Sequence, residues 1–279
     1  MLHDIGKVEA YSLQVPILSE PRNWRRYAAL GDSFTEGMCD EIGPDGRHRG
    51  WADLVARALA ERSLDSGGAG IEYANLAIRG RLIRQVMHEQ VPQAAALQPD
   101  LTSVAVGVND TLRRRFDLHA AATELEGGVR TLRAGGSDVL LFAFGDPSRR
   151  SKVMGSVRER IRAYNTAVEA IAELYDCYLV RFWDVAAMDD DRFWAEDRLH
   201  LSPAGHALAA QSALEALGLA GSEWRTPVVP ARPPRVAARA AGHARWVGGH
   251  LVPWTVRRIQ GASSGDGIVA KHPQWVRVD

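Results

Sequence analysis

The sequence predicts an α/β fold, a three-layer α/β/α sandwich with a five-stranded parallel sheet between two layers of helices. Short apolar runs alternate with stretches of helical periodicity between residues 23 and 220, which is typical of parallel strands joined by right-handed helical crossovers. The runs at 101–106 and 139–144 are almost wholly apolar, as expected of strands buried on both faces. Several runs end in glycine, aspartate or asparagine, at the strand ends where such proteins place functional groups.

The individual elements follow from local patterns. Strands are predicted at 27–30, 71–77, 101–106, 139–144 and 178–182. Apolar residues at i, i+3, i+4, i+7 and i+8 indicate a helix from residue 51, namely Trp51, Leu54, Val55, Ala58 and Leu59. Further helices are expected at 82–97 with an interruption near Pro92, at 117–133 and around 161–174. Ser202 as N-cap and Pro203 at the first helical position predict the start of the last helix.

Two segments flank this domain of residues 23–220. Residues 1–22 form an N-terminal segment in which 8–15 is a candidate edge strand. Residues 221–279 form an irregular extension rich in tryptophan and proline, with nine basic and three acidic residues. We expect this extension to cover the main domain as an appendage that does not continue the sheet; docking of a polyanion or glycan remains the alternative.

Composition excludes several classes of protein. The formal net charge of zero over 279 residues argues against a nucleic-acid partner. No apolar stretch reaches the roughly 20 residues that a membrane helix needs, so we expect no integral membrane association. Cys39 and Cys177 are too few for a disulfide framework, and the first residues lack a signal-peptide pattern. These features predict a cytoplasmic protein; the oligomeric state stays open.

Ser33 is the candidate nucleophile because Gly31-Asp32-Ser33 directly follows an apolar run. A serine hydroxyl needs a base to take its proton and a third group to orient that base. Asp197 and His200 lie on one loop after the strand at 178–182. That loop belongs to the same sheet edge as Ser33, so Asp197 could hold one ring nitrogen while the other faces the serine.

Two further strand ends offer donors for an oxyanion. The Gly80 N–H follows the strand at 71–77, and the Asn109 side chain follows the strand at 101–106. Asp32 is expected to shape its own turn by accepting backbone N–H groups. His206 is expected to be a partly exposed helix residue.

Neither a metal nor a second nucleophile is expected. His48, His88 and His119 lack the spacing of metal ligands, so we predict no metal and no cofactor. Ser263 fits a G-x-S-x-G pattern, but it lacks the preceding strand and following helix that a nucleophile elbow requires.

Four short segments carry these candidate residues: Gly31-Asp32-Ser33-Phe34, the Gly80 loop, 107–110 and Asp197-x-x-His200. Together they resemble the four blocks of the GDSL hydrolases, also called SGNH hydrolases. The resemblance covers roughly residues 25–218 in the family's order; Phe34 replaces a leucine, and Val108 sits within the third block. It implies a flavodoxin-like fold and a metal-free serine esterase or lipase. It also implies that Ser33 is the nucleophile, His200 the base and Asp197 its partner, with Ser33 N–H, Gly80 N–H and Asn109 as the oxyanion hole.

These residues predict hydrolysis of a small-molecule carboxylic ester through an acyl-enzyme. Carbohydrate O-deacetylation and acyl transfer to another alcohol use the same triad and remain open alternatives. A binding module that kept the fold without catalysis is the alternative from another class.

Overall fold

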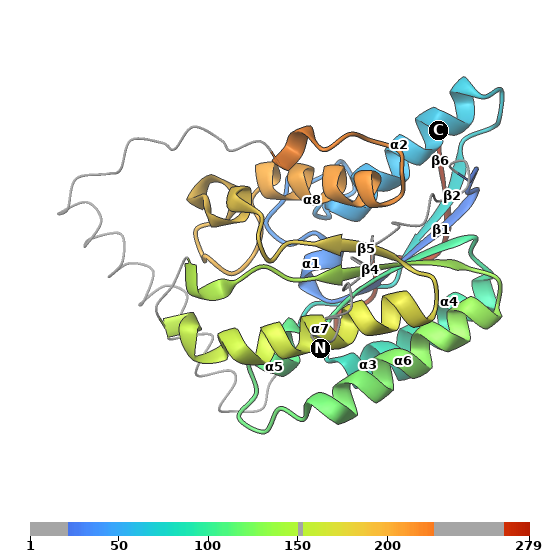
Figure 1. Cartoon of the computed structure of the whole chain (residues 1–279). Coiled ribbons are helices and arrows are strands. Elements are labelled where there is room, and N and C mark those ends of the chain that lie inside the picture. The colour runs from blue at the N-terminus through green and yellow to red at the C-terminus, as the bar shows by residue number, and fades with distance from the viewer. Residues whose placement is uncertain (1–21, 150–152, 226–264) are drawn as a thin grey trace, which may run out of the picture.

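The sheet has six strands in the order β5-β4-β3-β1-β2-β6, in a computed structural model that describes residues 22–149, 153–225 and 265–279 (Figure 1). The strands are Arg26–Gly31 (β1), Ile71–Asn75 (β2), Leu101–Ala105 (β3), Asp138–Ala143 (β4), Tyr178–Arg181 (β5) and His272–Val278 (β6). The first five pair in parallel. Their order is that of flavodoxin-like sheets, which confirms the predicted fold class and its five parallel strands.

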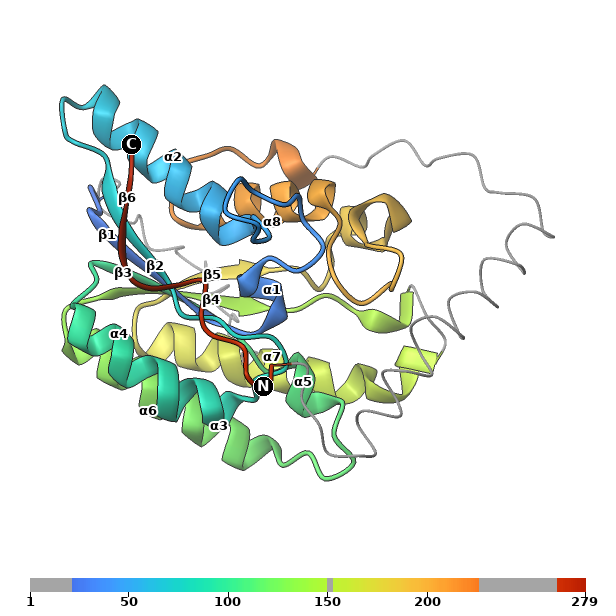
Figure 2. The ribbon, with the colours of Figure 1, turned by 180° about the vertical axis from the view of Figure 1, so that it is seen from behind.

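Helices cover both faces of the sheet. They are Ser33–Glu36 (α1), Trp51–Asp65 (α2), Ile83–Gln85 (α3), Val91–Leu97 (α4), Val108–Thr111 (α5), Leu118–Ala134 (α6), Arg158–Leu174 (α7) and Pro203–Ala216 (α8). Short 3₁₀ turns lie at Pro147–Arg149, Val153–Val157, Ala186–Asp189, Asp191–Phe193 and Glu223–Arg225. Helices α2 and α8 pack on one face, and α4, α6 and α7 on the other (Figures 1 and 2). Among the described residues, no helix is long and apolar enough to cross a bilayer.

The helical segment at 83–97 differs from the prediction. A π-helical turn, Val86–Gln90, joins α3 to α4, and Pro92 lies in the first turn of α4 rather than at a break. The wider turn projects Gln90 inward, where its Oε1 accepts from Gly31 N at 2.8 Å and its Nε2 donates to Gly31 O at 2.9 Å. Gln90 thus holds the end of β1.

The expectation that the C-terminal extension does not continue the sheet is wrong for its last residues. Strand β6 runs antiparallel to β2, with Val278 opposite Ile71 and Val276 opposite Tyr73. An edge position accepts a strand containing Pro273, because the missing N–H can face away from the ladder. The candidate strand at 8–15 and Ser263 lie outside the described residues.

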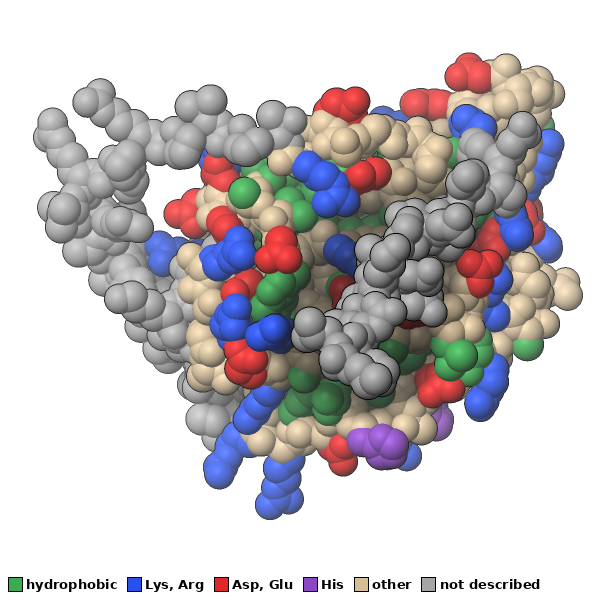
Figure 3. Space-filling view, in the orientation of Figure 1, with side chains coloured by type: hydrophobic (Ala, Val, Ile, Leu, Met, Phe, Trp, Pro, Cys, Tyr) green, Lys and Arg blue, Asp and Glu red, His purple; other side chains and the backbone are tan. Residues whose placement is uncertain are grey.

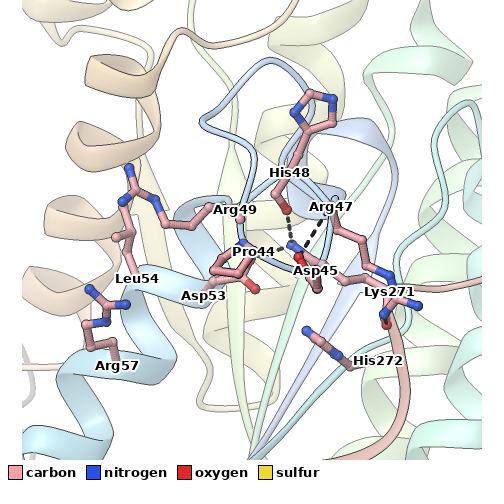
Figure 4. A pocket seen from close by; sticks show the side chains of 11 residues that line it. Pro44, Asp45, Arg47, His48, Arg49, Asp53, Leu54, Arg57, Lys271 and His272 are labelled. Carbon is pink, nitrogen blue, oxygen red and sulfur yellow. Dashed lines mark hydrogen bonds and ion pairs between the residues drawn. The ribbon is translucent and has the colours of Figure 1, made fainter.

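Lys271, directly before β6, anchors the extension to the domain. It is buried, and its Nζ donates to His48 O at 2.8 Å and to Asp53 Oδ2 at 2.7 Å (Figure 4). A cavity of about 260 Å³ lies between this segment, the 43–49 loop and the start of α2. The extension therefore packs against the loop that follows α1.

Candidate active site

Ser33 opens helix α1 directly after β1. Asp32 is its N-cap, and the Asp32 side chain accepts from Phe34 N at 3.1 Å, as the sequence predicts. Gly31 has φ +151°, and a Cβ there would lie 2.3 Å from the carbonyl oxygen of Ala105 on β3. Only glycine therefore fits where the chain leaves the sheet. At the first helical position, the Ser33 N–H has no intrahelical acceptor.

The structure brings Asp197, His200 and Ser33 into one hydrogen-bonded line. His200 Nε2 lies 3.0 Å from Ser33 Oγ, and His200 Nδ1 lies 2.6 Å from Asp197 Oδ2. The second carboxylate oxygen, Oδ1, accepts the backbone N–H groups of Leu199 and His200 at 2.9 and 3.0 Å. With Nδ1 donating to the carboxylate, Nε2 carries the lone pair that faces the serine hydroxyl.

The pair of Asp197 and His200 is strongly polarised. Burial opposes ionisation of Asp197, but hydrogen bonds from the His200 ring and from the two backbone N–H groups lower its pKa to about 2. Burial likewise opposes protonation of His200, but the interactions of its ring with Asp197 and with Cys39 together outweigh burial and raise the pKa of His200 to about 9. The carboxylate therefore favours the imidazolium that forms when His200 accepts a proton.

Asn109 lies against the serine turn. Its Nδ2 donates to Asp32 Oδ2 at 2.9 Å and to the carbonyl oxygen of Arg81 at 3.3 Å. Burial raises the pKa of Asp32 to about 7, although its hydrogen bonds from Phe34 and Asn109 act in the opposite direction. Asp32 thus links the turn after β1 to the turn after β3.

The loop that carries Gly80 is tied to α1 from the other side. Glu36 Oε2 accepts from the backbone N–H of Arg79 at 2.7 Å, and both Glu36 oxygens accept from Arg79 Nε at 2.9 and 3.0 Å. The Glu36 side chain is 10% exposed. The loop that carries Gly80 and the Asn109 side chain, which hold the two predicted oxyanion donors outside the serine turn, are therefore both bound to residues of α1 or its N-cap. Sequence reasoning did not identify Glu36.

His206 is not the exposed helix residue that the sequence predicts. It is 1% exposed because α8 packs it against the loop after α1. Its Nδ1 accepts from Trp51 N at 3.3 Å, and its Nε2 donates to the carbonyl oxygen of Met38 at 3.0 Å. His206 therefore fixes the chain between α1 and α2.

Cys39, which follows Met38, is a second residue that sequence reasoning did not place in the site. Its Sγ, a nitrogen of His200 and a carboxylate oxygen of Asp197 all lie within 4.8 Å of one another. In the part of the chain that the structure describes, this is the group of side chains that could hold a metal ion. Sequence spacing could not reveal this group, because Cys39 lies far along the chain from Asp197 and His200.

One hollow of the described surface is lined by residues that flank this site. A cavity of about 250 Å³ is lined by Glu36 and Arg79, together with Lys271 from the extension. Neither this cavity nor the one next to α2 is lined by Ser33, Asp197 or His200. Basic and acidic side chains lie intermixed on the face shown in Figure 3, in keeping with the zero net charge.

Residues 29–208 match the model of the GDSL-like lipase/acylhydrolase family. An acetylxylan esterase from Geobacillus stearothermophilus is 26% identical over 213 residues, which are 70% of this chain and 93% of that protein. The solved structure of Axe2, an acetylxylan esterase from the same organism, matches with a TM-score of 0.57 at 21% identity, covering 71% of this chain and 97% of that one. LAE5, an α/β hydrolase enzyme from the metagenome of Lake Arreo, Spain, matches with a TM-score of 0.57 at 22% identity over the same shares. At these identities the two structures show a shared fold.

Proposed function

This chain belongs to the GDSL-like lipase/acylhydrolase family and is a carboxylic ester hydrolase, and on that premise we propose that Ser33, His200 and Asp197 are its catalytic triad. The observation that carries the proposal is the line of hydrogen bonds from Ser33 Oγ through the His200 ring to Asp197 Oδ2. A nucleophile, a base and an orienting acid in this order are what acyl transfer by serine requires.

In the proposed reaction, Ser33 Oγ bonds to the ester carbonyl carbon as its proton passes to His200 Nε2. The tetrahedral intermediate collapses when the bond to the leaving alcohol breaks, and His200 gives its proton to that alcohol. Water then attacks the acyl-Ser33 carbonyl as its proton passes to His200 Nε2. The bond from the acyl carbon to Ser33 Oγ breaks, His200 gives that proton to Oγ, and the carboxylic acid leaves. Asp197 keeps its charge throughout and stabilises the imidazolium.

We assign the oxyanion hole to Ser33 N–H, Gly80 N–H and the Asn109 side chain. The bonds from Asp32 to Asn109 and from Glu36 to Arg79 support this assignment, because donors fixed before substrate binds need no reorganisation during the reaction. The 3.3 Å bond from Asn109 to Arg81 is longer than the 2.9 Å bond to Asp32. It is the bond that an ester oxygen would replace.

We propose an acetyl ester of a carbohydrate as the substrate class. The support is the relative named acetylxylan esterase, 93% of whose length aligns with this chain. Transfer of the acetyl group to a second alcohol uses the same residues and differs only in the acceptor of the acyl-enzyme.

A substrate panel tests both parts of the proposal. p-Nitrophenyl esters from acetate to laurate and acetylated xylooligosaccharides are given to the wild type and to Ser33→Ala. We expect acetate to be cleaved fastest, acetic acid to be released from the sugar, and Ser33→Ala to lose about 10³–10⁶-fold in kcat. Equal rates for wild type and Ser33→Ala would exclude the triad, and a preference for laurate would exclude the substrate class while leaving the triad standing.

A further inference from the structure

Cys39 occupies an unusual position next to the triad. Its backbone has φ +70°, a left-handed conformation that costs energy in residues other than glycine and is more often taken by asparagine or aspartate. Both cysteines of the chain are free thiols of intermediate exposure. Cys39 is therefore partly accessible to solvent.

The residues on both sides of Cys39 are anchored. The carbonyl oxygen of Met38 accepts from His206 Nε2 at 3.0 Å. Asp40 is buried, accepts from Arg49 Nε at 3.2 Å, and its N–H donates to Gly37 O at 3.1 Å. These contacts hold the turn, and none of them involves a residue of the triad. The Cys39 side chain therefore stays beside the His200 ring independently of the catalytic reaction.

The group that results has the ligand types of a zinc site. A thiolate, an imidazole nitrogen and a carboxylate oxygen are the ligands that Zn²⁺ prefers, and three protein ligands leave one position for water. Their ligand atoms all lie within 4.8 Å of one another, so small side-chain rotations can arrange the three around one ion. Binding releases the thiol proton and occupies a lone pair of His200.

We propose that Cys39, His200 and Asp197 form a site for a thiophilic divalent cation such as Zn²⁺, and that an ion bound there inhibits the enzyme. The ion is an inhibitor and not a cofactor, since it engages the imidazole that Ser33 needs as its base. Binding of the ion does not depend on the proposed function, whereas inhibition rests on it. No such site follows from a triad alone, because the triad lacks a soft ligand.

Binding is tested with Co²⁺ on protein freed of any histidine tag. Ser33→Ala is used, so that the result does not depend on esterase activity. We expect a thiolate-to-cobalt charge-transfer band that Cys39→Ser loses and Cys177→Ser keeps. Cys39→Gly, which removes the thiol and relieves the left-handed backbone, guards against misfolding of the serine variant and should also lose the band. A band that persists in both Cys39 variants would overturn the proposal.

Inhibition is tested by titrating Zn²⁺ against p-nitrophenyl acetate hydrolysis, each variant being compared with its own rate without metal. We expect EDTA to restore wild-type activity, and Cys39→Ser to raise the inhibitory Zn²⁺ concentration by about tenfold or more. Cys177→Ser is the matched control and should leave that concentration unchanged. Equal inhibition of wild type and Cys39→Ser would contradict the proposal. Failure of the triad assignment would appear instead as full activity in Ser33→Ala.

Discussion

At the amino end of the parallel sheet, Asp100 and Asp138 accept hydrogen bonds from arginine side chains and from backbone or indole N–H groups. At the carboxyl end, Asp32, Glu36 and Asp197 also accept backbone N–H groups, and each binds one further side chain, that of Asn109, Arg79 or His200. Asp138 begins β4 and is buried. Its carboxylate accepts from Arg22 Nη1, Trp24 Nε1 and Arg133 Nη1, each at 2.9 Å. Asp100 accepts from Arg25 N at 2.9 Å and Arg26 N at 3.0 Å.

The two ends differ in what their carboxylates hold. The groups bound to Asp138 are permanent donors, and none of them accepts a proton at neutral pH. Asp197 instead holds an imidazole whose second nitrogen faces a hydroxyl. A buried, well-bonded carboxylate is thus no sign of a catalytic site, because structural ion pairs look the same. The base and the nucleophile next to it make the difference.

Matched substitutions of aspartate by asparagine separate the two ends, and Asp197→Asn should show the largest effect. The amide oxygen can still accept the two backbone N–H groups, but the amide nitrogen donates to His200 Nδ1 and so places the ring proton on Nε2. A protonated Nε2 has no lone pair to accept the proton of Ser33. We expect kcat/KM for p-nitrophenyl acetate to fall by about 10³–10⁴-fold with little change in melting temperature. Near-normal activity would remove Asp197 from the triad.

Asp138→Asn at the amino end should show the reverse. A neutral amide offers one acceptor oxygen where the carboxylate serves Arg22, Trp24 and Arg133. It removes the counter-charge of Arg22 and the nearer counter-charge of Arg133, which keeps Asp176 at 4.0 Å. Both arginines keep some contact with water, with side chains 57% and 25% exposed. We therefore expect a loss of about 2–3 kcal/mol in the free energy of unfolding, measured by urea denaturation. If kcat of Asp138→Asn also falls under conditions in which the variant is folded, the contrast between the two ends does not hold.

The pH dependence of activity tests the carboxyl end without a substitution. His200 acts as a base only when neutral, and its pKa is raised to about 9. We expect kcat/KM to rise with pH through about 9 and to be about 100-fold lower at pH 7 than its plateau. Rates for Ser33→Ala provide the correction for spontaneous hydrolysis. Asp138→Asn should give the same profile, and a limb near pH 6.5 would show that Asp197 does not favour the imidazolium.

Local patterns in the sequence were enough to predict the parallel strands and to select Ser33, Asp197 and His200 as candidates, which the structure brings together. A strand-end turn and a short Asp-x-x-His loop are readable without knowledge of distant residues. The hydrogen bond between Gln90 and Gly31 joins residues 59 positions apart, and the one between His206 and Met38 joins residues 168 positions apart. Local periodicity carries no information about such distant pairs. Strand β6 escaped prediction because Pro273 argues against a strand except at an edge, and only the assembled sheet reveals which edge is open.

The smallest of these effects is expected from Glu36→Gln, which sharpens the comparison within the carboxyl end itself. Glutamine offers one acceptor oxygen, so the backbone N–H of Arg79 and its guanidinium must compete for it, and the loop that carries Gly80 loosens. Glu36 touches no reacting atom in the proposed mechanism and is a positioning residue. Because an oxyanion donor acts in the transition state, we expect kcat to fall about tenfold with KM nearly unchanged. Glu36→Ala, which removes the carboxylate bound to the Arg79 guanidinium, should lower kcat further. A fall in melting temperature without a change in kcat would instead place Glu36 with Asp138 among the structural carboxylates.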